Sequence, residues 1–119
     1  MQFYKNQQDH FFVQLDDGEF DHEDLAHVTV DNHQGDETKH QPVISYEGNQ
    51  VKVKIGDIMH PMTPEHHISM IFLKTEQGGQ YKIFKDLKTP ITCFQLSDDD
   101  KPLEVYGYCN LHGLWKETF

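Results

Sequence analysis

The amino-acid sequence predicts an all-β protein, built as an antiparallel sandwich or barrel. Short apolar segments recur at regular spacing, turn-forming residues separate them, and no segment shows a sustained helical period. The spacing of the segments does not distinguish a sandwich from a barrel. The length of 119 residues is sufficient for one domain with its own hydrophobic core.

Alternating and β-branched residues define the expected strands. Val51, Val53 and Ile55 alternate with lysines, as in a strand with one buried face. Gly78-Gly79 is typical of a hairpin turn between two apolar segments. Strands are expected over residues 11–13, 28–30, 42–46, 51–55, 68–74, 80–84, 91–96 and 105–109, with the last of these closing the fold.

The charge balance argues against nucleic acids and anionic membranes as partners. The formal net charge is −10, and all ten basic residues are lysines. Nucleic acids and anionic lipids both require clustered positive charge, and arginine is the usual reader of guanine. The N-terminal segment lacks the apolar stretch of a signal peptide, and the apolar run at 68–73 is too short to span a bilayer. We therefore expect a soluble, cytoplasmic protein.

The cysteine and histidine content favours a metal site over a disulfide. The chain has two cysteines, Cys93 and Cys109, and a disulfide is not expected in a protein without a secretion signal. Cys93 lies in an apolar segment, which predicts core packing. The chain also has nine histidines, and histidine is the commonest metal ligand.

Three short segments carry residues typical of a metal site. The first is Lys-His-Gln-Pro at 39–42. In the second, His60 and His66 flank two prolines that fix a loop. In the third, Cys109 and His112 are three residues apart at a strand end and are followed by a glycine. Each pattern alone is a weak signal, because cysteines are usually buried and histidine-rich loops are often solvated.

Taken together, the three segments predict a five-coordinate site for a first-row metal, with four imidazoles and one thiolate. A structural zinc site has four tetrahedral ligands, so this larger ligand set favours iron with an open sixth position. A thiolate opposite that position would push electron density toward a bound oxygen species, as in haem–thiolate enzymes.

The same segments closely resemble the superoxide reductase family, the neelaredoxins and desulfoferrodoxins. The family pattern is E-K-H-x-P, then H-P-M-x-x-x-H-x-I, then C-N-x-H-G-x-W, and residues 37–119 match it in order and spacing. The resemblance implies an immunoglobulin-like β-sandwich over 37–119 and one mononuclear non-haem iron. The implied equatorial ligands are His40, His60, His66 and His112, and the implied axial ligand is Cys109.

The activity implied by the resemblance is the one-electron reduction of superoxide to hydrogen peroxide without release of oxygen. The protein would then be an oxidoreductase that detoxifies superoxide under oxidative stress. Lys39 is the candidate catalytic residue, because a local positive charge beside a ligand can attract the anionic substrate and organise proton-donating water. The alternative for Lys39 is an ordinary exposed lysine.

Two departures from the family pattern stand out. Thr38 occupies the position of the usual Glu, with Glu37 one residue earlier. Either Glu37 reaches the sixth site from a shifted loop, or water or hydroxide occupies that site. We favour water or hydroxide, because a one-residue slip in an extended segment turns the side chain to the opposite face. Residues 1–36 resemble a desulforedoxin-like domain, but Asn6 and Asp9 stand in place of its first cysteine pair. We interpret residues 1–36 as a short N-terminal extension, the remnant of that domain without its metal, with surface histidines.

Several neighbouring residues are predicted to be structural. His67 should point away from the site, Met62 should fill irregular space, and Trp115 should pack beneath the metal loop. The alternatives to a reductase are an electron carrier of blue-copper type, a metal-binding sensor and a superoxide dismutase. Expected partners are an electron donor such as rubredoxin and a second copy of the chain in a homodimer.

Overall fold

A computed structural model describes residues 1–86 and 88–119 and divides the chain into two compact units, 1–30 and 31–119. Nearly all regular structure is antiparallel β-sheet, and the only helix among the described residues is the single turn α1 (Glu37–His40). None of the described helices is long and apolar enough to cross a membrane. Residues 31–36, which the sequence interpretation assigns to the extension, belong to the second unit.

The first unit is a three-stranded antiparallel sheet in the order β2-β1-β3. Its strands are β1 (Gln2–Lys5), β2 (Phe11–Gln14) and β3 (Ala26–Val28). In the turn between β1 and β2, the Asn6 side-chain oxygen accepts hydrogen bonds from the backbone N–H groups of Gln8 (3.0 Å) and His10 (2.9 Å). An amide side chain therefore closes this turn without a metal. The interpretation of this segment as a remnant domain stays a prediction.

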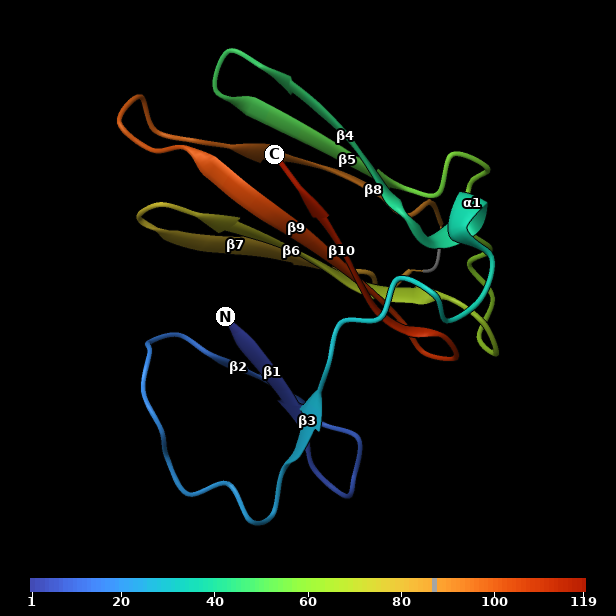
Figure 1. The fold of residues 1–119 in the computed structure, drawn as a ribbon. Coiled ribbons are helices and arrows are strands. Elements are labelled where there is room, and N and C mark those ends of the chain that lie inside the picture. The colour runs from blue at the N-terminus through green and yellow to red at the C-terminus, as the bar shows by residue number, and fades with distance from the viewer. Residues whose placement is uncertain (87) are drawn as a thin grey trace. The chain divides into compact units, whose positions relative to one another are not determined.

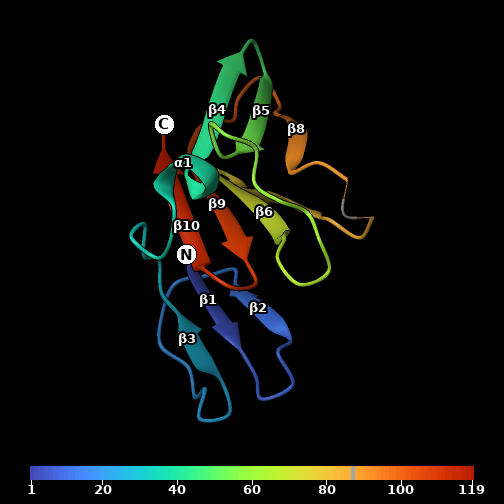
Figure 2. The same cartoon turned by 90° about the vertical axis from the view of Figure 1, so that its right-hand side faces the viewer.

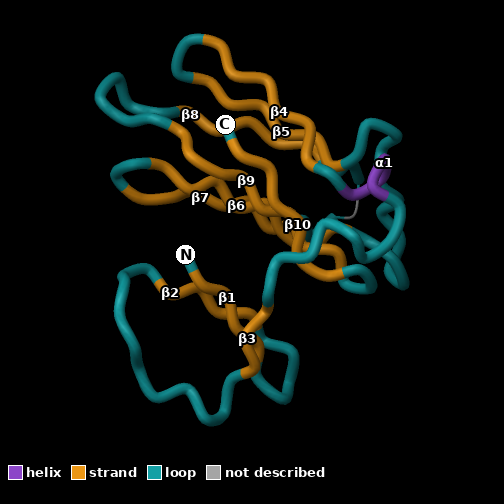
Figure 3. Tube along the Cα trace, in the orientation of Figure 1, coloured by secondary structure: helices purple, strands orange, loops and turns teal. Residues whose placement is uncertain are grey.

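The second unit is a two-layer sandwich of the immunoglobulin-like type, as Figures 1 and 3 show. One sheet has the order β4-β5-β8 and the other the order β10-β9-β6-β7. The strands are β4 (Pro42–Glu47), β5 (Gln50–Ile55), β6 (Ile68–Thr75), β7 (Gly78–Ile83), β8 (Ile91–Gln95), β9 (Pro102–Cys109) and β10 (Gly113–Thr118). The two sheets are separate among the described residues, which selects the sandwich over the barrel.

The core lies between the two sheets and follows the predicted alternation. Val51, Val53 and Ile55 of β5 are buried, and they pack with buried residues such as Leu73 of β6 and Val105 of β9. Successive side chains of a strand point to opposite faces, so the intervening lysines of β5 lie on the outer face. Figure 2 looks onto the end of the sandwich at which α1 lies.

Two strands were not predicted from the sequence. Strand β1 is short, and its two apolar residues, Phe3 and Tyr4, are both buried rather than alternating. Strand β10 follows the predicted final strand and likewise buries two consecutive residues, Leu114 and Trp115. Period-two alternation does not reveal strands of this kind, so the prediction that residues 105–109 form the last strand was wrong.

The prediction of core packing for Cys93 was also wrong, because Cys93 is exposed. Its cross-strand partner is Lys52, on the outer face of β5. The neighbouring pair, Val51 and Phe94, faces the core instead. An apolar segment of a strand therefore still alternates between its faces, and the position of Cys93 falls on the outer one.

The β6–β7 hairpin turns at Glu76-Gln77, not at the predicted Gly78-Gly79, which lies inside β7. The loop between β8 and β9, which contains Asp99 and Asp100, holds this turn. The side chain of Gln77 donates to the Asp99 carbonyl (2.7 Å), and the backbone N–H of Gln77 donates to the Asp100 carboxylate (3.1 Å). Gly79 has a packing role. A β-carbon there would lie 2.7 Å from a ring atom of Phe72, on the adjacent strand.

We predict that Gly79→Ala lowers the free energy of unfolding by about 1–3 kcal/mol, the usual consequence of overpacking. The added methyl group would also lie 3.1 Å from the backbone carbonyl oxygen of Leu73, which cannot move aside cheaply. Gly78→Ala is the matched control, because its β-carbon meets nothing within 4 Å. Urea denaturation measures both variants, and equal midpoints would contradict this account of the hairpin.

Candidate metal centre

The five predicted ligands come from three separate parts of the second unit. His40 ends α1, and His60 and His66 lie in the loop between β5 and β6. Cys109 ends β9, and His112 lies in the turn before β10. Figure 1 shows α1, the β5–β6 loop and the β9–β10 turn at the same end of the sandwich.

The turn that carries His40 is fixed by its N-cap residue, Asp36. The Asp36 carboxylate accepts hydrogen bonds from the Thr38 backbone N–H (3.0 Å) and from the Thr38 hydroxyl (2.6 Å). Side-chain hydrogen bonds to Thr38 are also the largest cause of a lowered pKa at Asp36. Pro42 follows the turn and prevents its continuation.

The β5–β6 loop holds the same turn from the other side. The N–H of Gly56 donates to the Gln41 carbonyl (3.1 Å), and the N–H of Ile58 donates to the Thr38 carbonyl (3.0 Å). Gly56 has a φ of +89°, and a β-carbon there would lie 2.7 Å from the Lys39 carbonyl oxygen. Only glycine permits both this backbone conformation and this close approach.

Thr38 and Glu37 form part of this helical turn, not the extended segment that the sequence argument assumed. The argument that a one-residue slip reverses the side chain therefore does not apply. The hydroxyl of Thr38 is bound to Asp36, whereas Glu37 is exposed and precedes His40 by three residues, the spacing of one helical face. Water at the sixth position stays a prediction.

His40 and His60 are buried and held in one tautomer. Nδ1 of His40 is 2.7 Å from the Asp36 carbonyl oxygen, and Nδ1 of His60 is 2.7 Å from the Pro61 carbonyl oxygen. A carbonyl oxygen only accepts, so each Nδ1 carries the proton. Burial lowers the pKa of His40, and it lowers that of His60 to about 4. Both rings are therefore neutral at physiological pH, each with a bare Nε2.

These bare nitrogens face one another without a proton between them. Nε2 of His40 lies 3.1 Å from Nε2 of His60 and 3.1 Å from Nδ1 of His112. Two lone pairs at this distance repel unless a cation lies nearby. Nε2 of His66 is buried and has no hydrogen-bond partner among the described residues. The unpaired atoms fit a bound metal ion, which takes neutral imidazole as a ligand.

Cys109 provides the only sulfur donor in this cluster. It is fully buried, and its sulfur accepts the backbone N–H of His112 at 3.4 Å. Burial raises the pKa of the Cys109 thiol, and the N–H groups of His112 and Leu111 partly oppose that rise. A bound metal ion would remove the thiol proton outright.

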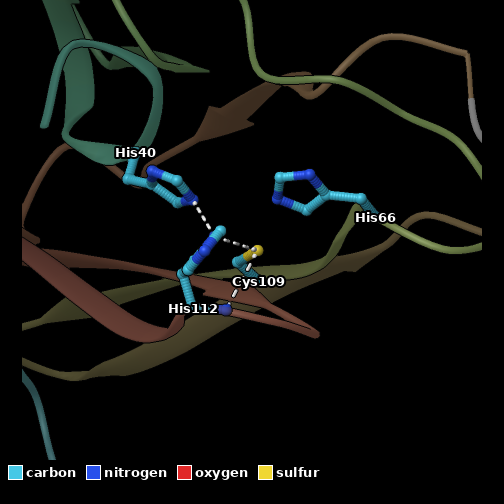
Figure 4. Close-up of side chains that lie close together, drawn as sticks. All are labelled: His40, His66, Cys109 and His112. Atoms are coloured by element: carbon cyan, nitrogen blue, oxygen red, sulfur yellow. Dashed lines mark hydrogen bonds between the residues drawn. The ribbon is translucent and has the colours of Figure 1, made fainter. Parts of the chain in front are cut away.

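The structure brings four of the five predicted ligands into one group. The ligand atoms of His40, His66, Cys109 and His112 lie within 4.8 Å of one another, a group able to hold a metal ion (Figure 4). His60 is not a member of this group of four, but it lies beside it: its Nε2 is 3.1 Å from Nε2 of His40, and its ring centroid is 4.6 Å from that of His66. His60 as a fifth ligand stays a prediction.

Two of the predicted structural residues support this cluster. Trp115 stacks on His40 with ring centroids 4.9 Å apart, and its indole N–H donates to the His112 carbonyl (3.2 Å). Met62 packs against the core, and its sulfur accepts the N–H of Ile68. His67 directs its Nδ1 to the Thr63 carbonyl (2.9 Å) and lies outside the metal-binding group.

Gly35 shapes the site, but the sequence does not predict this role, because Gly35-Asp36 is typical of any turn. It has a φ of +114°, and a β-carbon there would lie 3.0 Å from Cγ of His112 and 3.2 Å from Cε1 of His40. The missing side chain therefore provides the space in which both imidazoles lie.

We predict that Gly35→Ala weakens Zn²⁺ binding roughly 10- to 100-fold, the usual effect of disturbing the surroundings of metal ligands. Gly18→Ala is the matched control, because Gly18 has the same φ of +114° but nothing within 4 Å of its β-carbon. Both variants should lose about 1–3 kcal/mol of stability from backbone strain. Competition with a chelating indicator measures affinity, and equal affinities would show that Gly35 does not shape the site.

The comparisons with known proteins agree with this geometry. The Desulfoferrodoxin family model matches residues 32–118. The chain is 35% identical over 95 residues to a desulfoferrodoxin of Clostridium acetobutylicum, covering 79% of this chain and 73% of the relative. It is 42% identical over 96 residues to a superoxide reductase of Pyrococcus horikoshii, covering 66% of this chain and 83% of the relative.

A solved structure extends the similarity to almost the whole chain. The superoxide reductase from Treponema pallidum has a TM-score of 0.79 and 37% sequence identity, and the match covers 98% of both chains. The superoxide reductase from Giardia intestinalis covers 68% of this chain with a TM-score of 0.59 and 29% identity. With the family match over 32–118 and the His/Cys cluster in place, the chain belongs to the desulfoferrodoxin family of superoxide reductases.

Proposed function

We propose that the protein reduces superoxide to hydrogen peroxide at one mononuclear non-haem iron. The iron would be held by the imidazoles of His40, His60, His66 and His112 and by the thiolate of Cys109. The observation that carries this proposal is the convergence of three imidazoles and a thiol within 4.8 Å, with a buried Nε2 of His66 that has no partner among the described residues.

Bound iron would supply the single electron and return to the ferrous state through an external donor. Superoxide takes up this electron and two protons to give hydrogen peroxide, so no oxygen is released. Cys109 would place a thiolate against the metal and raise its electron density. The N–H of His112, which donates to that sulfur, moderates this effect by withdrawing charge from it.

Lys39 would attract the substrate anion. The net charge of −10 repels superoxide, so a local positive charge must oppose the overall field. Lys39 is exposed, and it forms no ion pair within residues 1–86 and 88–119. Burial lowers the pKa of His66, and the positive charges of His112, His67 and Lys39 lower it further, which indicates that the Lys39 ammonium lies near this part of the cluster.

The remaining assignments belong to the same proposal. An external one-electron donor such as rubredoxin would restore ferrous iron, in the cytoplasm, and the chain would form a homodimer. In the oxidised state, water or hydroxide would complete the set of groups bound to the iron, and the alternative is the exposed carboxylate of Glu37, which shares a helical face with His40.

The test is rapid mixing of the reduced, iron-loaded protein with a pulse of superoxide, followed by visible absorption. We predict a fast second-order phase that ends in ferric iron with a thiolate-to-iron charge-transfer band, together with peroxide and no oxygen. Cys109→Ser should lack this band. If the wild-type protein binds iron but reacts slowly, the site would serve electron transfer or sensing. A band that persists in Cys109→Ser would contradict the axial ligand.

We predict that Lys39→Ala slows the second-order reaction about tenfold or more at low ionic strength and reduces its salt dependence. Lys39→Arg keeps the charge and should retain most of the rate. Lys52→Ala is the matched control for net charge, because Lys52 is an exposed residue of β5 outside the site. Equal rates for Lys39→Ala and Lys52→Ala would show that only the overall charge matters.

A further inference from the structure

We propose that Asn110 is a positioning residue that sets the orientation of His66 and couples it to Cys109. This inference rests on the proposed iron site, in which His66 and Cys109 are ligands. Asn110 directly follows Cys109 at the end of β9, and its side chain reaches across to the β5–β6 loop that carries His66.

Both the oxygen and the nitrogen of the Asn110 side-chain amide form hydrogen bonds with this loop. Its oxygen accepts the backbone N–H of His67 (2.8 Å), and its nitrogen donates to the Glu65 carbonyl (2.9 Å). The Glu65 carbonyl belongs to the peptide group before His66, and the His67 N–H belongs to the peptide group after it. One side chain therefore holds both peptide groups that flank His66. The backbone N–H of Asn110 adds a third bond, to the His67 carbonyl (3.2 Å).

Thr63 binds the remaining polar groups of the same two peptides. The His66 N–H donates to the Thr63 carbonyl (3.2 Å) and hydroxyl (3.1 Å), and the Thr63 N–H donates to the His66 carbonyl (2.9 Å). All four polar groups of the peptides around His66 are thus bound, two by Asn110 and two by Thr63.

His66 needs this backbone support more than the buried histidines His40 and His60 do. His40 and His60 each have Nδ1 within 2.7 Å of a backbone carbonyl oxygen, which fixes the ring. Within the described residues, Nε2 of His66 makes no hydrogen bond, and the ring instead packs edge-on against those of His60 (centroids 4.6 Å apart) and His112 (5.0 Å). The direction of its Nε2 is therefore set through the backbone that Asn110 and Thr63 hold.

Because Asn110 is exposed, its effect on the orientation of His66 can be measured separately from its effect on the stability of the protein. Its hydrogen bonds lie at the surface, where water replaces them readily, so their loss changes the free energy of unfolding little. Metal affinity depends more steeply on ligand orientation, and loss of a group that orients a ligand typically weakens binding about 10- to 100-fold.

The experiment compares Asn110→Ala with wild type, His66→Ala and Asn49→Ala. Asn49→Ala is the matched control, because the Asn49 side chain also bridges two loops through an exposed hydrogen bond, which it donates to Asp98 in the β8–β9 loop. Zn²⁺ affinity is measured by competition with a chelating indicator, and the unfolding of the metal-free protein is measured in urea. The iron-loaded variants are also examined for the thiolate charge-transfer band.

We expect Asn110→Ala to bind Zn²⁺ about 10- to 100-fold more weakly than wild type, with a urea midpoint matching that of Asn49→Ala. The iron-loaded variant should keep the thiolate band at a shifted energy, because Cys109 remains bound. If Asn110→Ala and Asn49→Ala bind Zn²⁺ with equal affinity, the positioning role is wrong. Complete loss of the thiolate band in iron-loaded Asn110→Ala would also overturn it, because the substitution would then act on Cys109 and not on His66. If His66→Ala binds Zn²⁺ as tightly as wild type, His66 is not a ligand and the proposed site itself is wrong.

Discussion

The bare Nε2 atoms of His40 and His60 lie 3.1 Å apart in a buried setting, and the rest of the second unit is arranged around this contact. Both rings present a lone pair because a backbone carbonyl holds each Nδ1 proton. Such an arrangement is unfavourable without a cation and favourable with one. The buried Nε2 of His66, unpaired among the described residues, faces the same cluster. The polypeptide thus holds the imidazoles of His40 and His60 in the neutral form that a metal requires.

The sandwich keeps three of these groups in place because His40, Cys109 and His112 each lie at or next to the end of a regular element. Cys109 is the last residue of β9, and His112 immediately precedes β10, so the pairing of these two strands fixes the thiol relative to one imidazole. His40 ends a helical turn that is bonded to residues 56 and 58 of the β5–β6 loop. Glycines at 35 and 56 permit close approaches that any side chain would prevent. Ligand orientation is therefore a property of the backbone, and Asn110 and Thr63 extend the same principle to His66.

The electrostatic setting of the site differs from that of the protein as a whole. A net charge of −10 keeps anions away from most of the surface, whereas Lys39 adjoins a ligand and forms no ion pair within the described part of the chain. Its charge contributes to the lowered pKa of His66. In the proposed function, Lys39 provides the positive charge that would attract a small anion to the imidazole cluster, because a charge acts most strongly at short range.

The sequence alone determined the β class, most strands of the sandwich and the residues that meet in the cluster, because alternation and motif spacing are local properties. It did not reveal the burial of two consecutive residues in β10, the exposure of Cys93 or the turn at Glu76-Gln77, since these depend on which strand faces which. It also missed the helical turn at 37–40 and the roles of Gly35 and Asn110. Only the tertiary structure decided these features, because they arise from contacts between segments far apart along the chain, where shape and hydrogen-bond partners are set by packing and not by neighbouring residues.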